Sequence, residues 1–275
     1  SQYYCKVHPR KLALISLATL FLSTSATAIE DSRVPGGVAI IPIEADARPT
    51  FNGKPVLTIH HGEQHVAVVG LALSLDPGNY TLQNKGKQIP FQVKPKKYLE
   101  QRIYLENKRH VTPNTLDLDR IKSESQKQRG ALDAFDGTLD SIRMILPVEG
   151  PISGPFGKRR FFNDQPRRPH SGTDIAAPTG TPIKAAAQGR ISLIGDFFFN
   201  GRLVVIDHGE GLKTMYNHMD RIDVKEGQVV AQGEVIGTVG ATGRVTGAHL
   251  HLGVILNGVS VDPALFVPEI RALPQ

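Results

Sequence analysis

Residues 242–253 read TGRVTGAHLHLG, and this stretch holds two histidines separated by a single leucine. Alternate residues of a β-strand point to the same face. His249 and His251 would therefore share one face, while Leu250 and Leu252 enter the core on the other. The glycines before the pair are typical of turns. The stretch predicts a strand that holds two imidazoles over a cleft, although two surface histidines on a strand would give the same pattern.

Two further motifs lie upstream of this strand. The segment HSGTD at residues 170–174 carries an imidazole and a carboxylate, and Gly172 favours a loop or strand end over a helix. The segment YNH at residues 216–218 adds His218. Imidazole and carboxylate are good zinc ligands, and catalytic zinc usually has three protein ligands and one open position for water. His170, Asp174 and one of the paired histidines would supply such a set. The other histidine and His218 would remain for proton transfer and charge stabilisation.

The rest of the chain predicts a mainly β protein. Residues 146–275 contain short apolar runs separated by glycines, which indicates a compact all-β domain. Residues 29–97 also alternate short apolar runs with turns, as expected for a small β-sandwich. Residues 98–145 are rich in charged and amide side chains, with apolar residues at helical offsets. We expect this segment to be a short helical connector of one or two helices.

Residues 1–28 have the features of a signal peptide. A basic start precedes an apolar run at residues 12–22, and a small-x-small triplet ends at Ala28, where we expect cleavage. An uncleaved N-terminal anchor is the alternative, but the run is shorter than the roughly 20 residues of a membrane span. We therefore expect a secreted protein whose mature form has no transmembrane segment.

Charge and cysteine content narrow the functional classes. The formal net charge is +6, and the expected leader contributes Lys6, Arg10 and Lys11 to it. The remaining mild positive charge suits an anionic wall or membrane surface. We find no aromatic platform or helix-turn-helix pattern that would indicate nucleic-acid binding. Cys5 is the only cysteine; the mature chain would have no disulfide framework and no thiol nucleophile.

Residues 147–263 resemble the M23 metallopeptidases, the lysostaphin-type (LytM-domain) peptidoglycan endopeptidases. The N-terminal β-domain and connector resemble an arrangement found in periplasmic members from Gram-negative bacteria. The segments that carry the resemblance are GPFG at 154–157, HSGTD at 170–174, IAAPTGTP at 175–182, YNHM at 216–219, VKEGQVV at 224–230 and TGRVTGAHLH at 242–251.

The resemblance implies a role for each site residue. His170, Asp174 and His251 would hold one zinc ion, with water in the fourth position. His249 and His218 would be the catalytic histidines: His249 would orient or deprotonate the water and His218 would hydrogen-bond the tetrahedral oxyanion, and the two roles could be exchanged.

The sequence departs from the family pattern at two positions. Met219 stands where leucine is usual after the histidine, and Gly253 stands where many members have an acidic residue after an aromatic one. Both positions lie outside the metal set, so these departures concern substrate fit rather than catalysis.

These features predict a zinc metalloendopeptidase that hydrolyses peptide crosslinks of bacterial peptidoglycan. It would bind peptide stems in the periplasm of a Gram-negative bacterium, and its oligomeric state is left open. The scissile bond could be the D-Ala–diaminopimelate crosslink, which the N-terminal half favours, a glycine bridge or another wall peptide bond. The alternative function is that of a catalytically inactive LytM-type domain that regulates a cell-wall amidase, but such domains lack the metal ligands.

Four arginines precede the first metal motif. Arg159, Arg160, Arg167 and Arg168 fall within ten residues of the sequence. They would form either a solvated loop or a rim that attracts the carboxylates of wall peptides.

Overall fold

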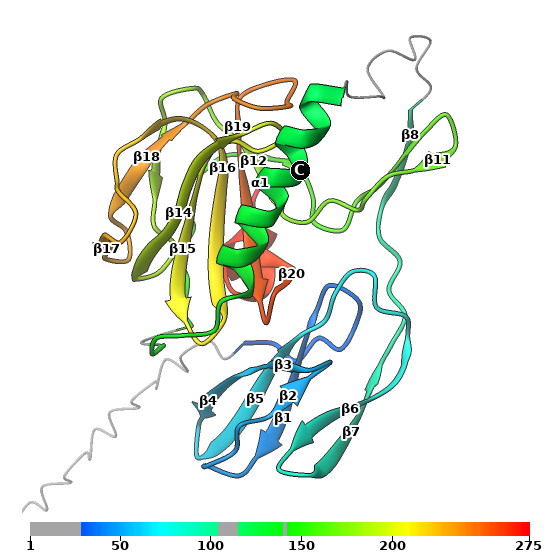
Figure 1. Cartoon of the computed structure of the whole chain (residues 1–275). Coiled ribbons are helices and arrows are strands. Elements are labelled where there is room, and N and C mark those ends of the chain that lie inside the picture. Colours follow the sequence, from blue (N-terminus) through cyan, green and yellow to red (C-terminus); the bar gives the residue numbers. More distant parts are fainter. Residues whose placement is uncertain (1–28, 104–114, 140–141) are drawn as a thin grey trace, which may run out of the picture.

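A computed structural model describes residues 29–103, 115–139 and 142–275 (Figure 1). The expected signal peptide lies outside these residues. The chain is mostly β-structure, which confirms the predicted fold class. Strands β1 to β7 form an N-terminal β-domain, and most of the later strands form a large sheet with helix α1 across one face. Within the described residues, the helices fall short of the length and apolar character that a bilayer crossing requires.

The N-terminal β-domain consists of two small antiparallel sheets, ordered β1-β5-β4 and β3-β2-β6-β7. Side chains from both sheets, including Val69 and Phe91, share one buried cluster, as in a sandwich. A turn at residues 84–87 joins β6 to β7, and Lys85 and Gly86 both have positive φ. The strands are β1 (Val38–Ile43), β2 (Thr50–Phe51), β3 (Lys54–Pro55), β4 (Leu57–His61), β5 (Gln64–Gly70), β6 (Gly78–Asn84) and β7 (Lys87–Val93).

The connector contains more than the expected helix. Helix α1 (Thr115–Asp133) is a single long helix, and its Leu132 packs on the apolar face of the large sheet. Before it, β8 (Glu100–Ile103) pairs in parallel with β10 (Arg159–Phe162), which continues into β11 (Gln165–Pro166). The range expected to be helical therefore also supplies a strand to the neighbourhood of the metal motif.

The large sheet has ten strands and runs β17-β14-β15-β16-β19-β12-β9, with β18 and β13 attached through β16 and β20 paired with β19. The buried leucines of β19, Leu250 and Leu252, lie in its core, as the alternation predicts. The strands are β9 (Ile152–Gly154), β12 (Thr173–Ala176), β13 (Pro182–Lys184), β14 (Gly189–Phe197), β15 (Gly201–Gly209), β16 (Leu212–Ile222), β17 (Val229–Val230), β18 (Val235–Val239), β19 (His249–Leu256) and β20 (Val259–Val261); 3-10 turns η2 (Pro263–Leu265) and η3 (Pro268–Ala272) follow.

The two β-regions are packed together through buried contacts. The Asn257 side chain accepts a hydrogen bond from the Gly70 amide (2.7 Å) and donates one to the Gly70 carbonyl (3.1 Å). Val66 and Val68 of β5 belong to the same apolar cluster as Leu256 of β19. The N-terminal β-domain thus rests directly on the sheet that carries the histidine pair.

A buried polar chain crosses the interior of the large sheet. His208 Nδ1 donates to the Gln188 carbonyl (2.7 Å), and Nε2 lies 2.8 Å from Thr214 Oγ1, which in turn is hydrogen-bonded to Tyr216. Burial lowers the pKa of His208 to about 4. His208 is therefore neutral near pH 7 and serves a structural role in this chain of hydrogen bonds.

We predict that His208 makes the fold sensitive to mild acid. Its folded pKa is below its ordinary value of 6.5, so its contribution to stability is complete above pH 6.5 and is lost as the pH falls toward 4. Between pH 7.5 and 5, urea denaturation of the wild type should lose about 2 kcal/mol more than that of His208→Gln. An equal loss in both proteins would show that His208 is not responsible.

Candidate metal centre

Three side chains converge where β12 meets β19. Asp174 and His251 lie directly opposite one another in the antiparallel pairing of these strands, and His170 approaches from the loop before β12. Asp174 Oδ1 lies 2.8 Å from His251 Nδ1 and 3.0 Å from His170 Nε2, and the two histidine nitrogens are 3.1 Å apart. Among the described residues these three form a group that could hold a metal ion.

The donor atoms of this group suit a cation. His170 Nδ1 lies 2.9 Å from the Pro155 carbonyl, which only accepts hydrogen bonds, so Nδ1 carries the proton and Nε2 presents a lone pair. That lone pair faces a carboxylate oxygen and a second imidazole. Burial by itself raises the pKa of Asp174, but the adjacent imidazoles of His170 and His251 outweigh burial and hold the pKa well below its usual range. An ionised carboxylate and a bare imidazole nitrogen aimed at one point fit a divalent metal.

Two glycines of the sequence motifs make room for these ligands. A Cβ atom on Gly154 would collide with the Asp174 carboxylate, and one on Gly172 would collide with the His251 ring. The glycines therefore serve close packing at the metal group, and this role was not part of the sequence interpretation.

The other two predicted site histidines lie beside the metal group. His249 is two residues before His251 on β19, and its Nε2 lies 3.7 Å from Asp174 Oδ1. The His218 ring centroid is 4.9 Å from that of His249 and 6.1 Å from that of His251. The structure thus brings all five predicted residues together.

His249 and His218 are oriented in the same way. His249 Nδ1 lies 2.9 Å from the Gly247 carbonyl, and His218 Nδ1 lies 2.8 Å from the Thr242 carbonyl. Each Nδ1 therefore carries a proton, so the neutral form of either ring presents Nε2 as a base. Burial lowers the pKa of His218 to about 4, against the effect of its hydrogen bond to Thr242.

The backbone of His218 is held in an unusual conformation. Its φ is +65°, which is uncommon for a residue other than glycine. The His218 amide donates to the Asn200 carbonyl (2.8 Å), and Thr242 Oγ1 donates to the neighbouring Met219 carbonyl (2.7 Å). Thr242 therefore fixes both the ring and the backbone at this position. The motif TGRVTGAHLH contains Thr242 but does not by itself reveal this role.

These side chains line an open cleft of about 590 Å³. The five site residues line this cleft, together with Arg160, Phe199, Asn200 and Arg244 among others. A cleft of this size admits an extended peptide to the metal group.

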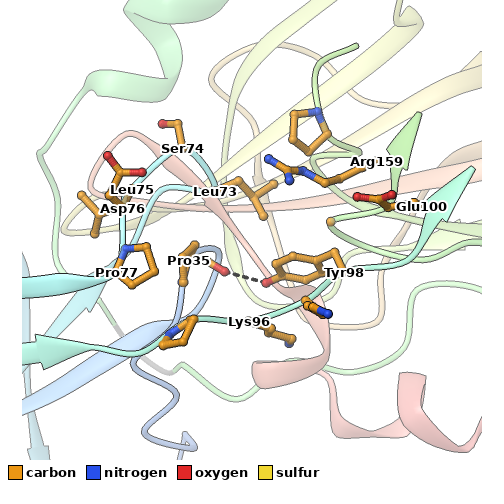
Figure 2. Close-up of a pocket in the computed structure, with 14 residues that line it drawn as sticks. Pro35, Leu73, Ser74, Leu75, Asp76, Pro77, Lys96, Tyr98, Glu100 and Arg159 are labelled. Carbon is orange, nitrogen blue, oxygen red and sulfur yellow. Dashed lines mark hydrogen bonds between the residues drawn. The ribbon is translucent and has the colours of Figure 1, made fainter. Parts of the chain in front are cut away.

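Contacts at the junction between the two β-regions support the loop that carries His170. The Gly157 amide donates to the His170 carbonyl (2.8 Å), and the His170 amide donates to the Lys158 carbonyl (3.0 Å). Tyr98 packs against Gly157, and its hydroxyl donates to the Pro35 carbonyl (2.6 Å). Tyr98 and Arg159 line a separate cavity between the two β-regions, and its volume is about 590 Å³. Figure 2 shows both side chains at this cavity.

Comparison with known proteins agrees with this architecture. A family model described as peptidase family M23 matches residues 168–263, and one described as the peptidase family M23 N-terminal domain matches residues 31–96. A crystal structure from Pseudomonas aeruginosa, described as that of an M23 peptidase, has a TM-score of 0.72 and 41% sequence identity, and the match covers 86% of this chain and 95% of that one. The chain belongs to peptidase family M23.

Curated proteins similar to this M23 chain include two named endopeptidases. It is 45% identical over 122 residues to the DD-carboxypeptidase/endopeptidase Mpg of Neisseria meningitidis, a match that covers 43% of the chain. It is 43% identical over 148 residues to the peptidoglycan DD-endopeptidase ShyA of Vibrio cholerae, a match that covers 51% of the chain. The matches span only 28% and 34% of the lengths of these relatives.

We predict that the Tyr98 support controls metal affinity in this M23 protein. Gly157 has a φ of +76° and no room for a Cβ beside the Tyr98 ring. Gly157→Ala should displace the loop that orients His170 and weaken metal binding by about tenfold, as is typical for residues that orient ligands. Competition with a chromophoric chelator measures this affinity.

The matched control is Gly227→Ala. Gly227 has a φ of +83°, but nothing lies within 4 Å of its added Cβ. It carries the same backbone strain without the collision and should leave metal affinity unchanged. Equal metal affinity in the two variants would rule out the Tyr98 support.

Proposed function

We propose that this chain is a zinc metalloendopeptidase that hydrolyses peptide crosslinks of bacterial peptidoglycan. One observation carries the proposal: His170, Asp174 and His251 aim three donor atoms at one point, next to two further imidazoles in an open cleft. Family membership and the names of the relatives agree with this activity.

The donor set favours zinc over other divalent ions. Two imidazole nitrogens and one carboxylate oxygen are a typical ligand set of catalytic zinc, and three protein ligands leave a position open to the cleft. When bound, zinc would act as a Lewis acid that makes water a stronger nucleophile near neutral pH and polarises a peptide carbonyl.

The two catalytic histidines would act first as bases. In the neutral form of each ring, His249 and His218 present Nε2 without a proton, because each Nδ1 donates to a backbone carbonyl. His249 Nε2 is close to the metal group and would accept the proton of the attacking water. Once protonated, either ring can donate to the oxyanion or to the leaving amine. The ring that accepts the proton of the attacking water is therefore the one that can donate afterwards, and His218 could hydrogen-bond the oxyanion only if it took that proton.

The relatives point to the bond and the compartment. Mpg is named a DD-carboxypeptidase/endopeptidase, and ShyA is named a peptidoglycan DD-endopeptidase. For this chain we propose the D-Ala–diaminopimelate crosslink as the scissile bond and the periplasm as the place of action, which requires the signal peptide predicted at residues 1–28. Mass spectrometry of the products of crosslinked peptidoglycan, incubated with the full chain and zinc, tests the bond.

The alternative is an inactive domain that regulates an amidase. The complete ligand set and the two bases in an open cleft favour the enzyme. Chelator-sensitive release of peptide fragments by the purified chain supports hydrolysis, whereas a chain that releases nothing with zinc present but stimulates a purified amidase would support regulation.

We predict that His218 and His251 separate catalysis from metal binding. His218→Asn keeps a residue that tolerates positive φ but removes the Nε2 base. It should retain zinc and lose about 10² to 10⁴-fold in turnover. His251→Ala should lose both zinc and activity. Zinc content by mass spectrometry and turnover on crosslinked peptides are the measurements; normal turnover in His218→Asn would refute its role.

A further inference from the structure

A second hollow adjoins the catalytic cleft, and arginine dominates it. It has a volume of about 650 Å³ and lies between helix α1 and the hairpin of β10 and β11. We call it the arginine pocket, because its cations are the guanidinium groups of Arg160, Arg167, Arg168 and Arg244. From the sequence alone, Arg160, Arg167 and Arg168 could form either a solvated loop or a rim that attracts carboxylates. The structure gathers them with Arg244, which comes from the loop before β19.

The arginine pocket is continuous with the site of chemistry. Arg160, Arg244, Phe199 and Asn200 line both this pocket and the cleft that holds the metal group. A peptide that reaches the metal group can therefore place a neighbouring part of its chain among the arginines.

The charge of this pocket is strongly positive. Among the described residues that line it, Glu124 is the only carboxylate. Glu124 Oε1 accepts from Arg120 Nε (2.6 Å), and Oε2 accepts from the Phe198 amide (2.8 Å), so both oxygens are committed to groups outside the pocket. Arg160 Nε is buried and has no hydrogen-bond partner in the described structure. Several guanidinium groups around one hollow favour an anion.

We propose that the arginine pocket is a substrate subsite that binds carboxylate groups of an acidic peptide while the scissile bond lies at the metal group. The inference rests on the proposed function and adds a preference for acidic over amidated wall peptides. Guanidinium groups match carboxylates in planar, two-point hydrogen bonds, which a neutral amide does not reproduce. The stems of crosslinked peptides carry such carboxylates on their glutamate and diaminopimelate residues.

The neighbouring Arg159 provides a matched control. Successive residues of a strand point to opposite faces; Arg160 faces the arginine pocket, whereas Arg159 lines the cavity beside Tyr98 and Glu100 (Figure 2). Arg159→Gln removes the same charge from the same strand without altering the proposed subsite.

The test compares two crosslinked peptide dimers, one with free glutamate and diaminopimelate carboxylates and one with these groups amidated. For the wild type, amidation should raise KM about tenfold or more, the usual effect of losing a hydrogen bond between charged groups, and leave kcat nearly unchanged. Arg160→Gln should bind both dimers alike. Arg160→Lys should recover part of the preference, because it keeps the charge but not the planar fork. Arg159→Gln should behave as the wild type.

Calorimetric binding of the same dimers to chelator-treated full-length chain separates the subsite from catalysis. If zinc-loaded wild type cleaves neither dimer, the proposed function fails, and this binding preference still decides the subsite. A wild type that binds acidic and amidated dimers equally would overturn the subsite. An unchanged preference in Arg160→Gln, or an equal loss of preference in Arg159→Gln, would overturn it as well.

Discussion

The antiparallel pairing of β12 with β19 is the constraint on which the site depends. It sets Asp174 opposite His251 and Ala176 opposite His249. Since strand side chains alternate between faces, a slip of one residue would send Asp174 into the core and bring Ile175 to the cleft. The apolar alternation of both strands forbids that slip, because Leu250, Leu252 and Ile175 are fully buried on the other face. The hydrophobic core thus fixes the geometry of the metal group.

The remaining site residues are held by contacts that the loops make with this sheet. His170 is oriented by the Pro155 carbonyl and by backbone hydrogen bonds to Gly157 and Lys158. His218 keeps a positive φ because the Asn200 and Thr242 segments fasten its backbone and ring. Such local strain persists only where the surroundings determine the conformation. The site is therefore preorganised, and the N-terminal β-domain contributes to it through the Pro35 carbonyl, which accepts the hydrogen bond of Tyr98.

The sequence predicted those parts of the site that depend on local periodicity. The alternation at residues 249–252 predicted that His249 and His251 lie on one face of a strand. The burial of Leu250 and Leu252 confirms the strand. Family membership confirms the resemblance, whereas the individual catalytic roles stay predictions. The parallel pairing of β8 with β10 was missed, because the polar segment EQRI has no apolar alternation and its partner is far away in the sequence.

Helix α1 also shows the limit of local patterns. The connector was expected to be helical, but no local signal indicated that the helix would lie along the sheet and wall a pocket beside the metal group. Phe135 and Leu139, two apolar residues of the range expected to be helical, follow the end of the helix at Asp133. The placement of Arg160 toward the cleft and Arg159 away from it likewise depends on the strand pairing of β10, which the sequence analysis did not find.

The central claim is that His170, Asp174 and His251 hold one zinc ion with a position left open. A crystal structure of the zinc-loaded full chain, with anomalous differences collected at the zinc edge, tests it most directly. The account predicts one strong peak about 2.0 to 2.2 Å from these three side chains, open toward His218 and His249. A peak at other residues, or a fourth protein ligand that closes the open position, would contradict it.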